Sequence, residues 1–211
     1  MPPVTEGVAA SHLHRSFFAR PTLDCARALL GRQLVHHGED GPVGGRIVEV
    51  EAYVGAEDPA CHAAAGRTRR NRVMWGPPGF VYVYFTYGMH HCLNLVTEAE
   101  GFGAAVLIRA LEPTVGIPIL AGRRTHLPRH RWLSGPGRVC AGLEIGLQHD
   151  GTDLQRGVIR VSRGRRAMGQ VSCSARIGIR RGRDRLWRFY LLGHPSVSGR
   201  RGAGGGDRGR A

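Results

Sequence analysis

The feature that most restricts the fold of this chain is a series of short segments with the composition of β-strands. Each is rich in β-branched or aromatic residues and is bounded by glycine, proline or acidic residues. They cover residues 33–37, 46–54, 80–87, 92–97, 104–111, 158–162 and 186–192. Helical patterns interrupt them irregularly, without a regular strand–helix alternation. The sequence therefore predicts a single α+β domain with a mainly antiparallel sheet.

Two segments have the pattern of helices that flank such a sheet. Residues 20–32 offer Thr22 as a candidate N-cap and Gly31 as the point where the helix ends. The apolar stripe between them consists of Leu23, Ala26, Leu29 and Leu30. Residues 134–147 predict a second helix, entered through Pro136.

The middle of the chain predicts a β-hairpin and a long polar loop. Residues 80–97 contain two strand patterns around Gly88, which places Tyr87 near the tip of the hairpin. Residues 54–80 are too many for an ordinary turn. Because long ordered loops often carry binding or catalytic residues, this stretch is a candidate functional loop.

The length of 211 residues suits one folded domain. We expect that domain over residues 14–198, with a flexible N-terminus over 1–13 and a disordered Gly/Arg-rich tail over 199–211. The chain has no apolar run of about 18 residues and no signal-peptide pattern, so we expect a cytoplasmic protein without membrane association. A monomer is the default expectation.

The positive charge is strong and unevenly distributed. All 30 basic residues are arginine, and the formal net charge is +14. Residues 1–60 carry a net charge of −3, whereas residues 61–211 carry +17. A surface that binds a polyanion should therefore come from the later part of the chain. Without lysine, covalent catalysis by an amine could use only the N-terminal amine.

The cysteines predict neither a disulfide framework nor a zinc ribbon. The five cysteines are widely spaced and include no C-x-x-C pair. We therefore expect buried free thiols at Cys25, Cys61, Cys92, Cys140 and Cys173. The one cluster that suggests a metal joins Cys61-His62 to His90-His91-Cys92. Adjacent residues of a strand point to opposite faces, so we expect no metal site.

Two arginine-rich loops flank the aromatic hairpin. One carries Arg67, Arg69, Arg70 and Arg72, and the other spans residues 123–132. A single basic loop is usually a solvated surface. Two such loops beside aromatic residues favour nucleic-acid binding, because arginine contacts phosphates while rings stack on bases or wedge between them.

The stretch "VEVEAY", residues 48–53, alternates with a period of two. On a strand, Glu49, Glu51 and Tyr53 share one face. Two carboxylates beside a tyrosine are unexpected in a protein with this positive charge, and they call for a chemical explanation.

Several long motifs resemble one family. Residues 46–96, "AVLIRALEP" (105–113), "SGPGRVCAGLEI" (134–145), "ARIGI" (175–179) and "WRFYLLGHPSVS" (187–198) occur in order and are similar to the alkyladenine (3-methyladenine) DNA glycosylases. The resemblance runs from about residue 14 to residue 198. It implies one mixed domain with a curved sheet, whose hairpin enters the minor groove of double-stranded DNA. Such enzymes flip a damaged purine into a pocket and cut its N-glycosidic bond with water, without a cofactor, in base excision repair.

The resemblance also implies the catalytic residues. Glu51 matches the general base, which takes a proton from a water molecule held also by Arg109 and by the backbone carbonyl of Ile177. The sugar becomes oxocarbenium-like, which a nearby carboxylate stabilises. One carboxylate suffices where the purine is alkylated and already cationic, unlike the pair used by O-glycosidases. Glu49 is then a supporting or surface group paired with an arginine.

The base pocket is implied in the same way. Tyr53, His62 and Tyr84 match the residues that enclose the flipped purine, and Asn94 matches the residue that crowds the 2-amino group of guanine. Tyr87 matches the ring that fills the gap in the DNA. Tyr84 shares its strand face with Tyr82, so one of these two rings could belong to the core.

Three classes of function remain open. The leading one is a monofunctional glycosylase of damaged purines, alkylated or deaminated. A bifunctional glycosylase could use the N-terminal amine, since removal of Met1 would expose Pro2; strand cleavage after base loss would reveal it. A non-catalytic DNA-binding module with an inactive pocket is the third, and a base-release assay distinguishes it.

Overall fold

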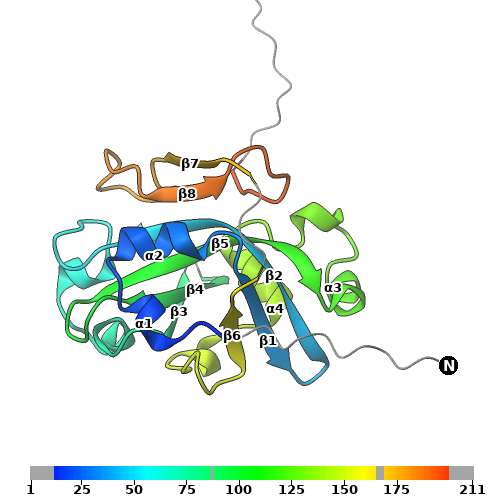
Figure 1. The fold of residues 1–211 in the computed structure, drawn as a ribbon, viewed down its shortest axis with the longest axis horizontal. Helices are drawn as coiled ribbons and strands as arrows, with labels where there is room; N and C mark the ends of the chain where they lie inside the picture. Colours follow the sequence, from blue (N-terminus) through cyan, green and yellow to red (C-terminus); the bar gives the residue numbers. More distant parts are fainter. Residues whose placement is uncertain (1–11, 87, 165–168, 200–211) are drawn as a thin grey trace, which may run out of the picture.

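The computed structural model describes residues 12–86, 88–164 and 169–199. Its core is an eight-stranded sheet in which all pairings are antiparallel (Figure 1). The main path joins β3 (Val81–Thr86), β4 (His90–Thr97), β5 (Ala104–Val115), β2 (Gly41–Tyr53), β1 (Gln33–Gly38) and β6 (Ile159–Ser162). β8 (Arg188–Leu191) pairs with β2 and with β7 (Val171–Ser174). This arrangement confirms the predicted α+β domain.

Helices and short 3-10 turns surround the sheet. The helices are α1 (Arg15–Phe18), α2 (Thr22–Leu29), α3 (Ile117–Arg123) and α4 (Pro136–Leu143). The turns are η1 (His62–Ala65), η2 (Arg72–Trp75), η3 (Arg129–Arg131) and η4 (Leu147–His149). Figure 1 shows α2 in front of the sheet and α4 behind it. The central strand β2 is accordingly buried at every position from 47 to 52. In the described parts of the chain, no helix is long and apolar enough to cross a membrane.

The helix α2 differs from the prediction at its N-terminus. Pro21, not Thr22, is the N-cap, and Thr22 lies inside the helix. The Thr22 hydroxyl donates to Glu98 Oε1 at 2.9 Å, so its side chain binds the loop after β4 instead of capping its own helix. The C-terminal prediction is confirmed, because the helix ends at Leu29 and Gly31 follows with a φ of 83°.

The strand β2 begins five residues earlier than predicted. Gly44 and Gly45 lie in this unpredicted part of β2 and are not typical strand residues. The packing of the sheet nevertheless requires glycine at both positions. A side chain at Gly44 would meet the carbonyl of Leu34, and one at Gly45 would meet the carbonyl of Glu112. The two glycines thus allow β1 and β5 to lie close to β2 on either side.

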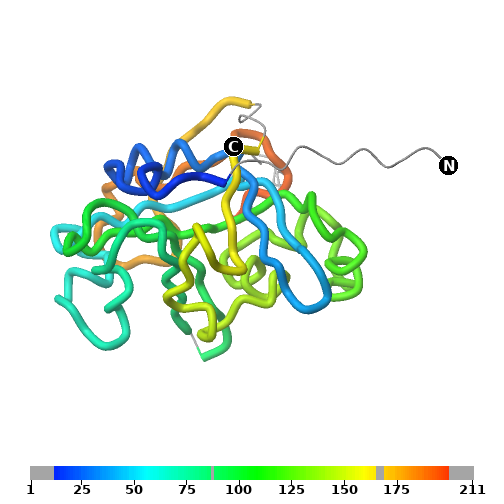
Figure 2. Tube along the Cα trace, turned by 60° about the horizontal axis from the view of Figure 1, so that its bottom comes forward, coloured from blue at the N-terminus to red at the C-terminus, as the bar shows by residue number. Residues whose placement is uncertain are grey.

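The predicted hairpin is confirmed by the pairing of β3 with β4, from Val81 opposite Leu95 to Thr86 opposite His90. Tyr87, the predicted tip residue, lies outside the described residues, and Gly88 follows with a φ of 67°. The loop 54–80 lies beside this hairpin (Figure 2). Arg70 joins the two, since its Nη2 donates to the carbonyl of Phe85 at 2.9 Å.

The loop 54–80 is an ordered element with a small core of its own. Its buried apolar residues pack against the hairpin and β5 in a cluster of Cys61, Ala63, Met74, Tyr82, Val96 and Ala105. Asn71 is buried and donates to the carbonyls of His62 and Gly66. These two bonds fix the backbone on both sides of η1, which places His62 against the sheet.

The outer segments lie almost wholly beyond the described residues. His12 and Leu13, at the edge of the predicted flexible N-terminus, pair with β6: His12 forms a bridge to Ser162, and the Leu13 N–H donates to the carbonyl of Val161. Of the predicted tail, only Gly199 is described.

Candidate active site

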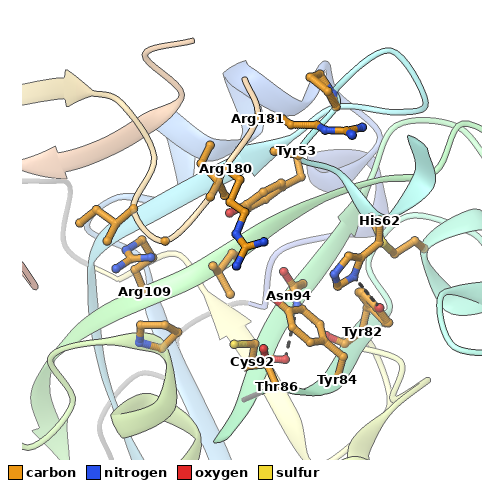
Figure 3. Close-up of a pocket in the computed structure, with 18 residues that line it drawn as sticks. Tyr53, His62, Tyr82, Tyr84, Thr86, Cys92, Asn94, Arg109, Arg180 and Arg181 are labelled. Carbon is orange, nitrogen blue, oxygen red and sulfur yellow. Dashed lines mark hydrogen bonds between the residues drawn. The ribbon is translucent and has the colours of Figure 1, made fainter. Parts of the chain in front are cut away.

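A cavity of about 560 Å³ opens between the hairpin, the loop 54–80 and residues 177–181 (Figure 3). Its volume is in the usual range for a small-molecule site. It brings together six of the residues predicted from the sequence: Tyr53, His62, Tyr84, Asn94, Arg109 and Ile177. Four of these residues lie in strands of the sheet, in β2, β3, β4 and β5, whereas His62 lies in η1 and Ile177 follows β7.

Glu51 lies beside this cavity and is fully buried. In β2 it stands opposite Leu107 of β5 and Arg188 of β8, so two neighbouring strands fix its backbone. Its Oε1 accepts the N–H of Ile177 at 2.7 Å and lies 3.2 Å from Arg109 Nη1. Its Oε2 accepts the hydroxyl of Tyr53 at 2.9 Å. Three donors thus fix the carboxylate in one orientation, and Arg109 balances its charge.

Tyr53 is a hydrogen-bond donor to Glu51 and part of the cavity wall. Burial raises the pKa of the Tyr53 phenol far above its usual range, and the adjacent Glu51 carboxylate adds to this effect. The phenol therefore keeps its proton for the bond to Glu51. The guanidinium of Arg176 lies 4.7 Å from the centre of the Tyr53 ring and holds it from the other side.

Arg176 in turn joins two segments of the site. It is buried and forms two hydrogen bonds with Asp58, and it also donates to the carbonyl of Ala52 at 2.9 Å. Burial alone would raise the pKa of Asp58, but the bonds from Arg176 outweigh this and lower it. No sequence pattern predicted this pair. Arg176 stands in the recognised "ARIGI" segment, which was the available signal.

Glu49 is buried as completely as Glu51, so the predicted surface alternative is wrong. Its pairing with arginine is confirmed: Oε1 accepts Arg109 Nε at 2.9 Å and Arg188 Nε at 2.7 Å. Ser198 donates its backbone N–H to Oε2 at 2.6 Å and its hydroxyl to Oε1 at 2.9 Å. Glu49 thus accepts four hydrogen bonds, which fill about four lone-pair sites, whereas Glu51 accepts two and adds one ion pair. Neither carboxylate lines the cavity itself, and Glu49 supports Arg109.

Arg109 is held between the two carboxylates. Burial alone would lower the pKa of its guanidinium, but Glu51 and Glu49 raise it. Its Nη2 donates to Ser198 Oγ at 3.2 Å. Every part of the guanidinium is therefore fixed, and the charge that it presents to the cavity stays in one place.

An aromatic wall faces Tyr53 across the cavity. His62 Nδ1 lies 2.9 Å from the hydroxyl of Tyr82, and the ring centres of His62 and Tyr84 are 4.6 Å apart in a T-shaped, edge-to-face arrangement. Tyr82 is nearly inaccessible, so it is the core member of the Tyr82–Tyr84 pair. Burial lowers the pKa of His62, with a further contribution from Arg70, which favours a neutral imidazole.

Asn94 lies in β4 and lines the cavity beside Tyr84 (Figure 3). Its Nδ2 donates to the carbonyl of Tyr82 at 3.1 Å and to that of Cys92 at 3.3 Å. These bonds fix the side-chain amide, which is 4% exposed, at a defined position in the cavity.

The basic loops differ from each other. In the first, the side chains of Arg67, Arg69, Arg70 and Arg72 are all exposed. In the second, several arginines bind the protein itself: Arg123 pairs with Asp40 and Glu144, and Arg124 donates to the carbonyl of Arg138. The first loop is therefore the better candidate surface for a polyanion.

The cysteines contribute no disulfide and no apparent nucleophile. Four are buried as predicted, whereas Cys173 is exposed, contrary to the prediction, because it lies in β7, which pairs only with β8. Burial raises the pKa of Cys25 to about 12 and that of Cys61 to about 11, so these thiols stay protonated. Within the described ranges, no three His, Cys, Asp or Glu side chains are grouped so that they could hold a metal ion.

A fixed carboxylate beside an aromatic cavity, in a strongly basic domain, is the arrangement expected of an enzyme that acts on a flat aromatic group carried by a polyanion. The chain belongs to the methylpurine-DNA glycosylase family, whose sequence model matches residues 16–195. It is 48% identical over 193 residues to a protein of Methanocella arvoryzae, a match that covers 89% of this chain and 96% of that protein.

Two further relatives are similar to the same degree. A protein of Carboxydothermus hydrogenoformans is 47% identical, with 88% of this chain and 98% of the relative covered. One of Streptomyces avermitilis is 46% identical, with 88% and 90% covered. All three carry the name "Putative 3-methyladenine DNA glycosylase".

Proposed function

We propose that this protein is a monofunctional DNA N-glycosylase that removes damaged purines, alkylated or deaminated, and leaves an abasic site for base excision repair. The observation that carries the proposal is Glu51, a buried carboxylate held by Ile177, Tyr53 and Arg109 beside a cavity with an aromatic wall. Membership of the methylpurine-DNA glycosylase family supports the same conclusion.

Binding begins at the exposed arginines of the first basic loop. Arg67, Arg69, Arg70 and Arg72 contact phosphates, which positions the hairpin over the minor groove. Tyr87 then fills the gap that the extruded nucleotide leaves. Extrusion costs a few kcal/mol, and least where the base pair is already damaged.

The flipped purine lies between Tyr53 on one side and His62 and Tyr84 on the other. Stacking contributes about 1–3 kcal/mol per base and tolerates different purines, which suits a broad range of lesions. Asn94 restricts that range. Because its amide is fixed by two carbonyls, it cannot move aside, and it crowds the 2-amino group of guanine.

The reaction follows from the position of Glu51. Its oxygens offer about four lone-pair sites, of which two accept hydrogen bonds from Ile177 and Tyr53 and a third faces Arg109, so at least one is left for a water molecule. Water attacks the anomeric carbon while the bond to the purine breaks, and Glu51 takes the proton. The carbonyl of Ile177 and the guanidinium of Arg109 orient the water. The negative charge of Glu51 also stabilises the oxocarbenium-like sugar.

The experiment that tests this proposal is base release from duplexes that each carry one lesion: 3-methyladenine, ethenoadenine or hypoxanthine. Release of a free base, with strand cleavage only after alkali, supports a monofunctional glycosylase. Strand cleavage without alkali would instead support the bifunctional alternative, whose N-terminal amine lies outside the described residues. Binding of the duplexes with no release of any base would support the non-catalytic alternative.

A further inference from the structure

The segment that follows Ile177 brings two further arginines to the cavity, in addition to Arg109. Arg180 and Arg181 both line it. Figure 3 shows Arg180 reaching into the cavity between Tyr53 and Tyr84, whereas Arg181 extends past Tyr53 and away from Asn94. Neither residue was singled out by the sequence, because a pair of arginines in a chain with 30 of them gives no signal.

Arg180 differs from Arg109 and Arg176 in having no anion to balance its guanidinium group. Arg109 is bound by Glu49 and Glu51, and Arg176 is bound by Asp58. The side chain of Arg180 forms no hydrogen bond or ion pair with any residue that the structure describes, and it is exposed to the cavity. It therefore brings a net positive charge to the space proposed for the flipped base.

That charge has opposite effects on two classes of damaged purine. A deaminated purine such as hypoxanthine is neutral in DNA, and it leaves with the electron pair of its glycosidic bond, as an anion. A purine alkylated at N3 or N7 is cationic in DNA and leaves as a neutral molecule. A guanidinium beside the ring stabilises the developing anion in the first case and repels the bound cation in the second.

We propose that Arg180 is a specificity-determining residue that shifts this enzyme toward neutral damaged purines and away from cationic ones. Its planar N–H donors match acceptors on the edge of a purine, and they act on the leaving group while Glu51 acts on water. The electron pair of the broken bond stays on the purine, and solvent later supplies the proton. The inference rests on the proposed function, and it gives Arg180 the role of stabilising the leaving purine.

The test is the ratio of two release rates under single-turnover conditions, hypoxanthine over 3-methyladenine, with spontaneous depurination subtracted. In Arg180→Gln we expect this ratio to fall roughly tenfold or more, as for the loss of a charge-assisted hydrogen bond. The rate for hypoxanthine should fall, while that for 3-methyladenine stays or rises. Arg180→Lys keeps the charge and should retain much of the ratio.

Arg156→Gln is the matched control. Arg156 is exposed, does not line the cavity, and loses the same unit of charge, so its ratio should equal that of the unaltered protein. An unchanged ratio in Arg180→Gln would overturn the inference. If Arg180→Gln lowers the release rates of both lesions equally and also weakens binding to undamaged DNA, the inference would also be overturned, and Arg180 would be a phosphate contact. If the unaltered protein releases neither base, the proposed function itself fails, which is a separate outcome.

Discussion

The carboxylates of Glu49 and Glu51 lie two residues apart on β2 and have different surroundings, which supports different roles for them. Glu51 accepts two hydrogen bonds, both from residues that line the cavity, whereas Glu49 accepts four, from Arg109, Arg188 and twice from Ser198. The alternation of "VEVEAY" predicted that they share a face. The alternation did not predict which carboxylate would be bound by further donors, because Arg188 and Ser198 are more than a hundred residues from Glu49 in the sequence.

The sharpest prediction at this scale is Glu51→Gln. The amide keeps the shape of the side chain but cannot take a proton from water, so release of hypoxanthine should fall by about 10²–10⁴. Release of 3-methyladenine should fall less, because its bond is already labile. Single-turnover rates and lesion affinity should be measured on the same protein. Near-normal release of hypoxanthine, or affinity lost in parallel with activity, would show that Glu51 has a structural role only.

A second prediction concerns Asn94→Gly. Removal of the side chain opens the space proposed to reject the 2-amino group, so release of undamaged guanine relative to hypoxanthine should rise by roughly tenfold or more. The matched measurement is the thermal midpoint, since the lost bonds to Tyr82 and Cys92 also loosen the hairpin. An unchanged preference in a folded variant would contradict the steric assignment.

At the scale of elements, the position of the cavity wall depends on the buried pair Arg176–Asp58. It ties the segment after β7 to the start of the loop 54–80 and to the end of β2. Arg176→Met should lower the free energy of unfolding by about 3–5 kcal/mol, because it leaves a buried carboxylate without its partner. Arg185→Met is the control. Arg185 lies 3.8 Å from the same carboxylate but is partly exposed, so its loss should cost less than about 1 kcal/mol in urea unfolding.

The same pair predicts a direction of pH dependence. The pKa of Asp58 is lowered in the folded protein, so its contribution to stability is present above the unfolded pKa, about 4. The contribution is lost as the pH falls below that value toward the folded pKa. The free energy of unfolding in urea should therefore fall less between pH 6 and pH 3 in Arg176→Met than in the unaltered protein. An equal fall in the two proteins would contradict the assignment.

The elements themselves were largely predictable because local patterns determine them. β-branched and aromatic runs predicted the main strands, and the pattern around Gly88 predicted the hairpin. The start of β2 at Gly41 was not predictable, because Gly44 and Gly45 serve the close approach of neighbouring strands and leave no strand signal. The position of Thr22 in α2 was misjudged for a similar reason: its hydroxyl binds Glu98, which is distant in sequence.

The whole molecule combines a strongly basic surface with an open cavity that has an aromatic wall. The excess charge of +17 over residues 61–211 should give binding to undamaged DNA a strong salt dependence. Each phosphate contact adds close to one unit to the slope of log affinity against log salt. Arg67→Gln should therefore reduce the slope by about one, and Arg27→Gln, which lies on α2 over the ring of Phe189, should not. A slope near zero for the unaltered protein would remove the phosphate-contact model.

The bond between Ser198 and Glu49 has a consequence for the timing of biosynthesis. The two residues are separated by 149 positions, and Arg188 lies 139 positions from the same carboxylate. A ribosome that has translated the strands β1 to β6 has produced most of the sheet, but Arg109 does not yet have its full set of partners. Because a domain generally folds as a unit, we expect Glu49 and Arg109 to reach their final arrangement only after the chain has been made through Ser198. A premature stop shortly before residue 198 would leave a protein in that incomplete state permanently.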